Sequence, residues 1–277
     1  MSTSQQTLAQ SVSDSGISLH TGEVVNLSIL PGEPDTGIRF RRVDLPGKPE
    51  VKARVSNVSD LLRNTTLESG AAKVSTVEHV MSALHGLAVD NAVVELDGGE
   101  PPIFDGSAQR LVEMIQSAGM VQQSNPRQLL SLQSPVSVME GDRILIALPH
   151  EGFRISCTFA DERGRMTQYF SVDVDPGQYV KQIAPARTFT FAEDIEPLVQ
   201  QGKIKGGSID TAIVIKGETI LSKEPLRFQD EFVRHKILDI IGDIALLGCP
   251  LRAHIVAIKP GHAINSKLTQ KLAELLA

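Results

Sequence analysis

The chain has 277 residues, of which 41% are hydrophobic and 22% charged, an ordinary globular composition that excludes a disordered, coiled-coil or collagen-like protein. At about 150 residues per domain, this length fits one large domain or two small ones. The net charge of -6 argues against a general nucleic-acid or anionic-membrane binder. This charge is uneven, with 9 basic and 15 acidic residues up to Asn125 but 18 of each from Pro126 onward.

The sequence carries no signal for export or stable membrane insertion. Its first ten residues lack the basic region and apolar core of a signal peptide. The longest apolar stretch, 237–251, is interrupted by Gly242 and two aspartates, and falls short of the roughly 18–20 apolar residues of a membrane span. The two cysteines, Cys157 and Cys249, are too few for a disulfide framework, so we expect core thiols in a cytoplasmic protein.

Hydrophobic periodicity predicts alternating strands and helices in the first half of the chain. The expected elements are strands at 24–30 and 37–43, a helix at 75–87, a strand at 91–96 and a helix at 111–118. The polar run 122–126, which ends in proline, predicts a linker.

The second half starts again with strands. The expected elements are strands at 129–132, 136–138, 144–147 and 154–159, a helix at 191–201, a hairpin of 209–215 with 218–221, a helix at 229–247, a strand at 254–258 and a helix at 266–276.

Both halves end in the same order: a helix carrying a histidine, a strand, a loop with glycine and proline, and a second helix. The histidines are His79 and His235. This weak repeat predicts an α+β fold of two related modules, 1–125 and 126–277, packed face to face so that the helices carrying the two histidines could meet. Because ligand sites often lie at such junctions, we expect the site at the interface.

His235 and Asp239 form the strongest local pattern. They are four residues apart on a predicted helix, so they share one face and can grip one cation. Imidazole with carboxylate suits Zn²⁺. The alternative is an ordinary surface pair on a charged helix.

Glu78 and His79 form a second pattern, because metallohydrolases place a general base beside the metal-bound water. The alternative is structural: Ser75 and Glu78 have the spacing of a capping box, with Ser75 as N-cap. His79 could equally be a core histidine.

Two further segments could carry chemistry. His262 follows a predicted strand end and a turn, a common place for an active-site acid, although a turn histidine at the surface fits equally. Thr188 could donate a hydrogen bond to a developing oxyanion, with Phe189 and Phe191 offering apolar surface. The alternative for these three is a strand with a buried face.

Several longer stretches together resemble the UDP-3-O-acyl-N-acetylglucosamine deacetylase family, the zinc amidases of lipid A biosynthesis. They occur in the family's order between about residues 16 and 268. The stretches are 16–22 (GISLHTG), 75–79 (STVEH), 102–108 (PIFDGSA), 186–189 (ARTF), 228–236 (FQDEFVRHK) with Asp239, and 261–265 (GHAIN).

The resemblance implies a fold of two similar two-layer α/β modules packed helix layer to helix layer. It also implies roles for particular residues. It implies that Zn²⁺, or Fe²⁺ because the ligands suit both, is bound by His79, His235 and Asp239. Glu78 would be the general base, His262 an acid or electrostatic stabiliser, and Asp243 the residue that orients His262. Thr188 would assist the oxyanion.

The resemblance also implies a nucleotide-sugar lipid as substrate. Lys236 would contact this substrate, and the nucleotide would lie near Arg143, Phe159 and Lys259. Phe189 and Phe191, with the segment up to Leu221, would line a passage for the acyl chain. The competing hypotheses are a metal-dependent dehydratase or other lyase, and a non-enzymatic nucleotide-sugar binding module.

Overall fold

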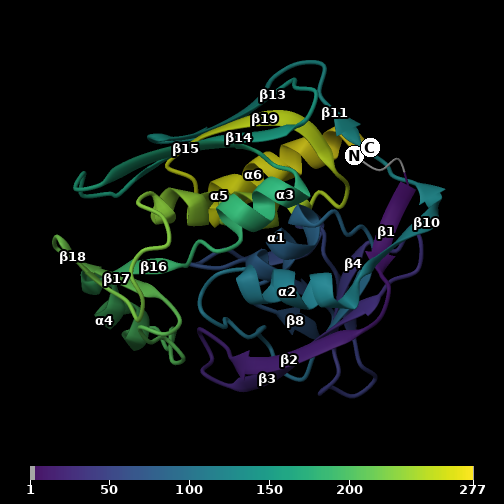
Figure 1. The fold of residues 1–277 in the computed structure, drawn as a ribbon, viewed down its shortest axis with the longest axis horizontal. Coiled ribbons are helices and arrows are strands. Elements are labelled where there is room, and N and C mark those ends of the chain that lie inside the picture. The colour runs from purple at the N-terminus through teal and green to yellow at the C-terminus, as the bar shows by residue number, and fades with distance from the viewer. Residues whose placement is uncertain (1–3, 277) are drawn as a thin grey trace.

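The computed structural model describes residues 4–276 and has helices lying between two β-sheets (Figure 1). One sheet belongs to the first half of the chain and the other to the second half. The α+β class expected from the sequence is confirmed.

The first sheet has the strand order β2-β3-β9-β4-β5. Its strands are β2 (Val12–Ile17), β3 (Val24–Pro31), β9 (Ala92–Leu96), β4 (Ile38–Arg42) and β5 (Glu50–Lys52). The central strand β9 comes last in the chain and runs antiparallel to β3 and parallel to β4.

The second sheet has the order β12-β13-β19-β14-β15, with the short β11 (Leu130–Ser131) also pairing with β19. Its strands are β12 (Val136–Glu140), β13 (Arg143–Leu148), β19 (Leu251–Ile258), β14 (Phe153–Ala160) and β15 (Thr167–Asp173). Again the last strand, β19, lies at the centre, antiparallel to β13 and parallel to β14. The two sheets therefore share one pairing pattern.

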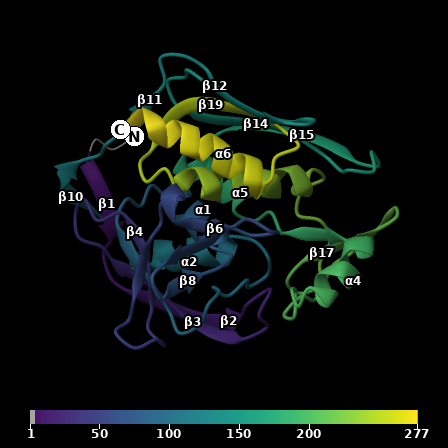
Figure 2. The same ribbon diagram turned by 180° about the vertical axis from the view of Figure 1, so that it is seen from behind.

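Four helices fill the space between the sheets (Figure 2). They are α1 (Glu78–Gly86), α2 (Gln109–Ala118), α5 (Glu231–Ala245) and α6 (His262–Ala273). Helix α5 is buried at every position except Lys236, because it packs against α1, α6 and the second sheet at once. Such a helix must be apolar on nearly every side, so the polar residues it does carry are conspicuous.

Three small sheets and several short turns complete the described part of the chain. The further strands are β1 (Ser4–Leu8) with β10 (Met120–Pro126); β6 (Val58–Asp60), β7 (Thr66–Ser69) and β8 (Ala72–Val74); and β16 (Phe189–Phe191), β17 (Ile213–Lys216) and β18 (Thr219–Leu221). The other helical segments are η1 (Val55–Asn57), α3 (Pro176–Gln178), the π-helix η2 (Tyr179–Ile183), α4 (Ala192–Gln200) and η3 (Glu274–Leu276). The third sheet and α4 form an insert at one side of the molecule (Figure 1).

The structure differs from the expected elements at several places. The run 122–126 is part of strand β10, which pairs with β1, and is not a flexible linker. Helix α6 starts at His262, four residues earlier than expected. In the two large sheets, strands β2, β5 and β15 were not predicted. The mostly intermediate and exposed positions of β2 and β15 give only a weak apolar alternation. Within 4–276, no helix is long and apolar enough to cross a bilayer.

Candidate metal centre and active site

A pocket of about 740 Å³ opens between the two halves of the chain. Its walls include Leu19, His20 and the start of α1 from the first half, and α5, α6, β14 and the insert from the second. Every site residue expected from the sequence lines it except Asp243. These are Glu78, His79, Arg143, Phe159, Thr188, Phe189, Phe191, His235, Lys236, Asp239, Lys259 and His262.

Glu78 and His79 occupy the first two positions of α1. The capping-box alternative is wrong, because the N-cap is Val77 and no side chain caps the helix. The chain instead enters α1 through Thr76, which has a left-handed φ of 55°. Glu78 is buried, and its Oε2 accepts a hydrogen bond from the backbone N–H of Thr65 at 3.0 Å. Glu78 also lines the pocket.

Gly242 lets α1 and α5 meet at the site. A Cβ at this position would lie 2.1 Å from the carbonyl oxygen of Glu78, well inside van der Waals contact. The absence of a side chain thus allows the first turn of α1 to lie directly against α5. This close approach brings His79 beside His235 and Asp239.

His79, His235 and Asp239 form a compact group of metal donors. One potential ligand atom from each lies within 4.8 Å of the others, and all three side chains are buried. Oδ1 of Asp239 lies 3.4 Å from Nε2 of His235 and 4.0 Å from Nε2 of His79. Two imidazoles and one carboxylate at this spacing suit a tetrahedral divalent cation that keeps a position open for water or substrate.

Hydrogen bonding and charge prepare these donors for a metal. Nδ1 of His235 lies 3.0 Å from the carbonyl oxygen of Ala186, which makes Nδ1 the donor and leaves the lone pair of Nε2 free. Burial and the neighbouring His235 lower the pKa of His79 to about 3. Burial opposes ionisation of Asp239, yet Lys236 and His235 hold its pKa well below the usual range. Neutral imidazoles and an ionised carboxylate are the forms that bind metals.

Glu78 and His262 lie close together beside the donors. Nε2 of His262 lies 3.8 Å from Oε1 of Glu78. Burial raises the pKa of Glu78 to about 7, so its carboxyl group can exchange a proton near neutral pH. Burial would lower the pKa of His262, but the charge and hydrogen bond of Asp243 outweigh it and raise this pKa to about 10.

Asp243 lies behind His262 and outside the pocket lining. Its Oδ2 lies 2.9 Å from Nδ1 of His262 and accepts a hydrogen bond from Asn265 at 2.8 Å. The hydroxyl of Thr65 donates to its Oδ1 at 2.7 Å. Thr65 thus holds both Glu78 and Asp243, and sequence reasoning missed it because a lone threonine in a loop carries no pattern.

Thr188 and the phenylalanines of β16 face the pocket from the insert. The N–H of Thr188 donates to Gly106 at 2.8 Å and its carbonyl accepts from Ile213 at 2.9 Å, which fixes its place. The ring of Phe189 lies 4.7 Å from that of Phe232 and 5.2 Å from that of Phe159. The strand alternative is confirmed for Phe189 and Phe191, which lie in β16 at half-buried positions, whereas Thr188 precedes the strand.

Three of the basic residues that line the pocket, those expected to contact substrate, each pair with an acidic side chain. Nζ of Lys236 lies 2.9 Å from Oδ2 of Asp239. Arg143 pairs with Glu162, and Lys259 pairs with Asp142. Arg143 and Lys259 also lie side by side, since Arg143 donates to the carbonyl of Lys259 at 3.3 Å. An anionic ligand would meet both cations together.

Comparison with known proteins agrees with this geometry. The model of the family described as LpxC, UDP-3-O-acyl N-acetylglycosamine deacetylase, matches residues 5–274. Proteins named UDP-3-O-acyl-N-acetylglucosamine deacetylase are similar to the chain in three bacteria. The relative in Saccharophagus degradans is 45% identical over 95% of this chain and 88% of its own length. Those in Myxococcus xanthus and Pseudomonas entomophila are 45% and 43% identical over 97% of this chain, covering 86% and 89% of their own lengths. The chain therefore belongs to the UDP-3-O-acyl N-acetylglycosamine deacetylase family.

Proposed function

We propose that this chain hydrolyses the N-acetyl group of UDP-3-O-(3-hydroxyacyl)-N-acetylglucosamine and releases acetate, the committed step of lipid A biosynthesis. The observation that carries the proposal is the convergence of a metal-donor triad, a buried carboxylate and a charged histidine in one pocket. Amide hydrolysis needs such a set, because the carbonyl is a poor electrophile and water a poor nucleophile.

Zn²⁺ is the metal we assign to His79, His235 and Asp239, with Fe²⁺ as the alternative that these ligands also suit. The buried donors fit it, because two neutral imidazoles and one carboxylate offset one of its two charges. Bound zinc supplies Lewis acidity, which lowers the pKa of water and polarises a carbonyl.

Glu78 and His262 would divide the proton transfers. The Glu78 carboxylate, oriented by the Thr65 N–H, would take a proton from the attacking water. His262, held as a cation by Asp243, would donate a proton to the departing amine. The Thr188 hydroxyl would hydrogen bond to the oxygen that becomes negatively charged. Acetate and a free amine are the products.

The substrate would extend from this centre along two walls of the pocket. Arg143, Lys259 and Lys236 supply positive charge for a diphosphate, and Phe159 an apolar surface near it. Phe189 and Phe191 line the side that leads to the insert, which would guide the acyl chain. The half that binds the nucleotide is the one without net charge, so the acidity of the whole chain does not oppose anion binding there.

We further propose two modules, 1–125 and 126–277, in a cytoplasmic protein. The shared strand pairing of the two sheets supports the division. The buried, unpaired Cys157 and Cys249 are consistent with a reducing compartment.

The test is acetate release from the UDP-linked substrate, measured together with metal content. We expect about one zinc per chain and loss of acetate release after chelation, restored by added zinc. A protein that holds stoichiometric zinc but releases no acetate would exclude deacetylation and favour a lyase. A protein without stoichiometric metal would favour the binding-module hypothesis.

A further inference from the structure

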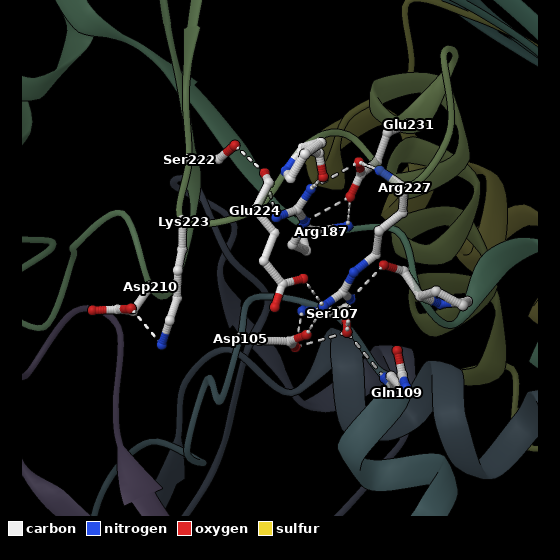
Figure 3. A network of polar contacts seen from close by, with 12 residues as sticks. Asp105, Ser107, Gln109, Arg187, Asp210, Ser222, Lys223, Glu224, Arg227 and Glu231 are labelled. Carbon is white, nitrogen blue, oxygen red and sulfur yellow. Dashed lines mark hydrogen bonds and ion pairs between the residues drawn. The ribbon is translucent and has the colours of Figure 1, made fainter.

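Arg187 and Glu231 form a buried ion pair next to the metal centre, outside the chemistry described so far (Figure 3). Arg187 is 5% exposed and Glu231 is fully buried. Nε and Nη2 of Arg187 donate to the two carboxylate oxygens at 2.8 and 3.1 Å, which is a bidentate geometry. The backbone N–H of Arg187 donates to the same carboxylate at 3.0 Å.

The pair holds a short segment of chain that contributes to the site at both ends. Ala186, on one side of Arg187, accepts the hydrogen bond from Nδ1 of His235. Thr188, on the other side, lines the pocket. Glu231 and His235 are four residues apart on α5 and so lie on one face of the helix. Helix α5 therefore binds segment 186–188 through Glu231 and His235, which lie one helical turn apart.

A second set of contacts connects Glu231 and segment 186–188 to the first half of the chain. The N–H of Arg227 also donates to Glu231, at 2.7 Å. Its guanidinium pairs with Asp105 at 2.7 Å and donates to the carbonyl of Pro185 at 2.9 Å. Figure 3 shows Arg187, Glu231, Arg227 and Asp105 as one continuous network. The loop that contains Asp105 also accepts the Thr188 N–H through Gly106.

Stability alone is a weak reason for such a pair. Taking two charges out of water is costly, and apolar residues of the same shape often stabilise a protein as well or better. A bidentate arginine adds geometric definition, because the guanidinium fork accepts only a narrow range of carboxylate positions.

We propose that Arg187 and Glu231 are positioning residues of the active site. They hold segment 186–188 against α5, so that the Ala186 carbonyl fixes the ring of His235 with Nε2 toward the metal and the Thr188 hydroxyl stays in the pocket. This inference rests on the proposed function, because it assigns the pair a role in metal binding and turnover.

The test compares R187Q, R187K and E231Q with a matched control, R127Q. Arg127 forms a largely buried ion pair with Asp90, in which Nη2 and Nε donate to one carboxylate oxygen at 2.7 and 3.0 Å, but this pair lies outside the active-site pocket. For each variant we would measure zinc affinity by chelator competition, urea unfolding, kcat and KM.

We expect R187Q and E231Q to lower zinc affinity about 10- to 100-fold, the usual effect of losing a residue that orients a metal ligand. Because Thr188 acts in the transition state, kcat should fall more than KM changes. R187K keeps the charge but loses the bidentate geometry of the guanidinium, so its zinc affinity and kcat should lie between those of wild type and R187Q. R127Q should lose stability to urea and keep wild-type zinc affinity and kcat.

Wild-type zinc affinity and kcat in R187Q and E231Q, with stability lost as in R127Q, would overturn the inference and leave a purely structural pair. If R187Q does not fold, R187K and E231Q make the same comparison. Zinc affinity of H235A, measured in the same way, distinguishes failure of the proposed metal site from failure of the positioning role. If wild type binds zinc no better than H235A, the proposed metal site is wrong. If H235A loses zinc affinity but R187Q and E231Q keep wild-type zinc affinity and kcat, only the positioning role is wrong.

Discussion

The large sheets of the two halves have the same strand order, but the two halves add different elements to it. In each, a helix precedes the central strand and another follows it: α1 and α2 around β9, and α5 and α6 around β19. The first half adds the small sheet of β6, β7 and β8 before its helix. The second half adds the π-helix and the insert of β16, α4, β17 and β18 in the corresponding place.

The candidate site residues differ between the two halves more than the strand order does. Helix α1 presents Glu78 and His79 in its first turn, whereas α5 presents His235, Asp239 and Asp243 from its interior. Neither half contains the three metal donors, so the site exists only where the two helices meet. A repeated frame can thus carry an asymmetric active site, and changes on the two sides of the interface should have distinct consequences.

The largest effect should come from removing one metal donor from each half. H79A and D239A should both lose stoichiometric zinc, and acetate release should fall to background, because two remaining ligands hold the ion poorly. Metal analysis after gel filtration measures this directly. H150Q, which changes an exposed histidine outside the pocket, is the control and should keep its zinc. Full zinc content in either alanine variant would remove that residue from the ligand set.

Glu78 should show the next largest effect, and it separates the two functional residues of α1. E78Q keeps the shape of the side chain and removes the base, so kcat should fall by a factor on the order of 10² or more while zinc content persists. The result to compare is that of H79A, its neighbour, which should lose the metal. Near-normal turnover in E78Q would rule out Glu78 as the base.

In the second half, Asp243 should control the alkaline limb of the pH profile. The pKa of His262 is raised to about 10, above its ordinary value of 6.5, so the proposed acid is present below pH 10 and is lost as pH rises through this value. D243N removes the charge that raises the pKa, so the limb should move down by about one unit or more. A profile of kcat against pH measures both limbs, and an unchanged alkaline limb in D243N would mean that another group titrates there.

The same raised pKa predicts a dependence of stability on pH. Because folding raises the pKa of His262, its contribution to stability is fully present below pH 6.5 and is lost as pH rises toward 10. D243N should flatten this loss in urea unfolding measured across that range. An equal loss in both proteins would assign it to other groups.

Sequence patterns predicted most of the helices and most of the strands of the two large sheets, because these elements bury one face in a common core. The spacing of His235 and Asp239 was informative, since four residues along a helix fix a common face. It could not show that His79, 156 positions earlier, completes the group, because only the packing of α1 on α5 brings them together. The capping box failed for a related reason: tertiary contacts at Thr65 and Thr76 set the start of α1 and override a local motif.

Thr65, Ala186 and Arg187 were beyond pattern reasoning in another way. Ala186 contacts His235 through its backbone carbonyl, and Thr65 contacts Glu78 through its backbone N–H and Asp243 through its hydroxyl. Backbone contacts of this kind leave no mark on the residue type. Arg187 was visible as part of a family stretch, but its partner Glu231 lies 44 positions away. Gly242 gave the opposite signal: in the sequence it only interrupts an apolar run, yet it governs how closely the two halves approach.

G242A should give the smallest effect of the set and tests that approach directly. The added Cβ would lie 2.1 Å from the carbonyl oxygen and 2.8 Å from the carbonyl carbon of Glu78, and both are backbone atoms that no rotamer change can move. Helix α1 must therefore shift, which should lower the free energy of unfolding by about 1–3 kcal/mol. Because Glu78 and His79 move with the helix while His235 and Asp239 do not, kcat should fall as well. G152A, at a glycine whose nearest neighbour would be 3.8 Å away, should change neither quantity. If G242A loses stability but keeps full activity, the site tolerates displacement of one half against the other, and its geometry does not depend on the close contact of α1 with α5.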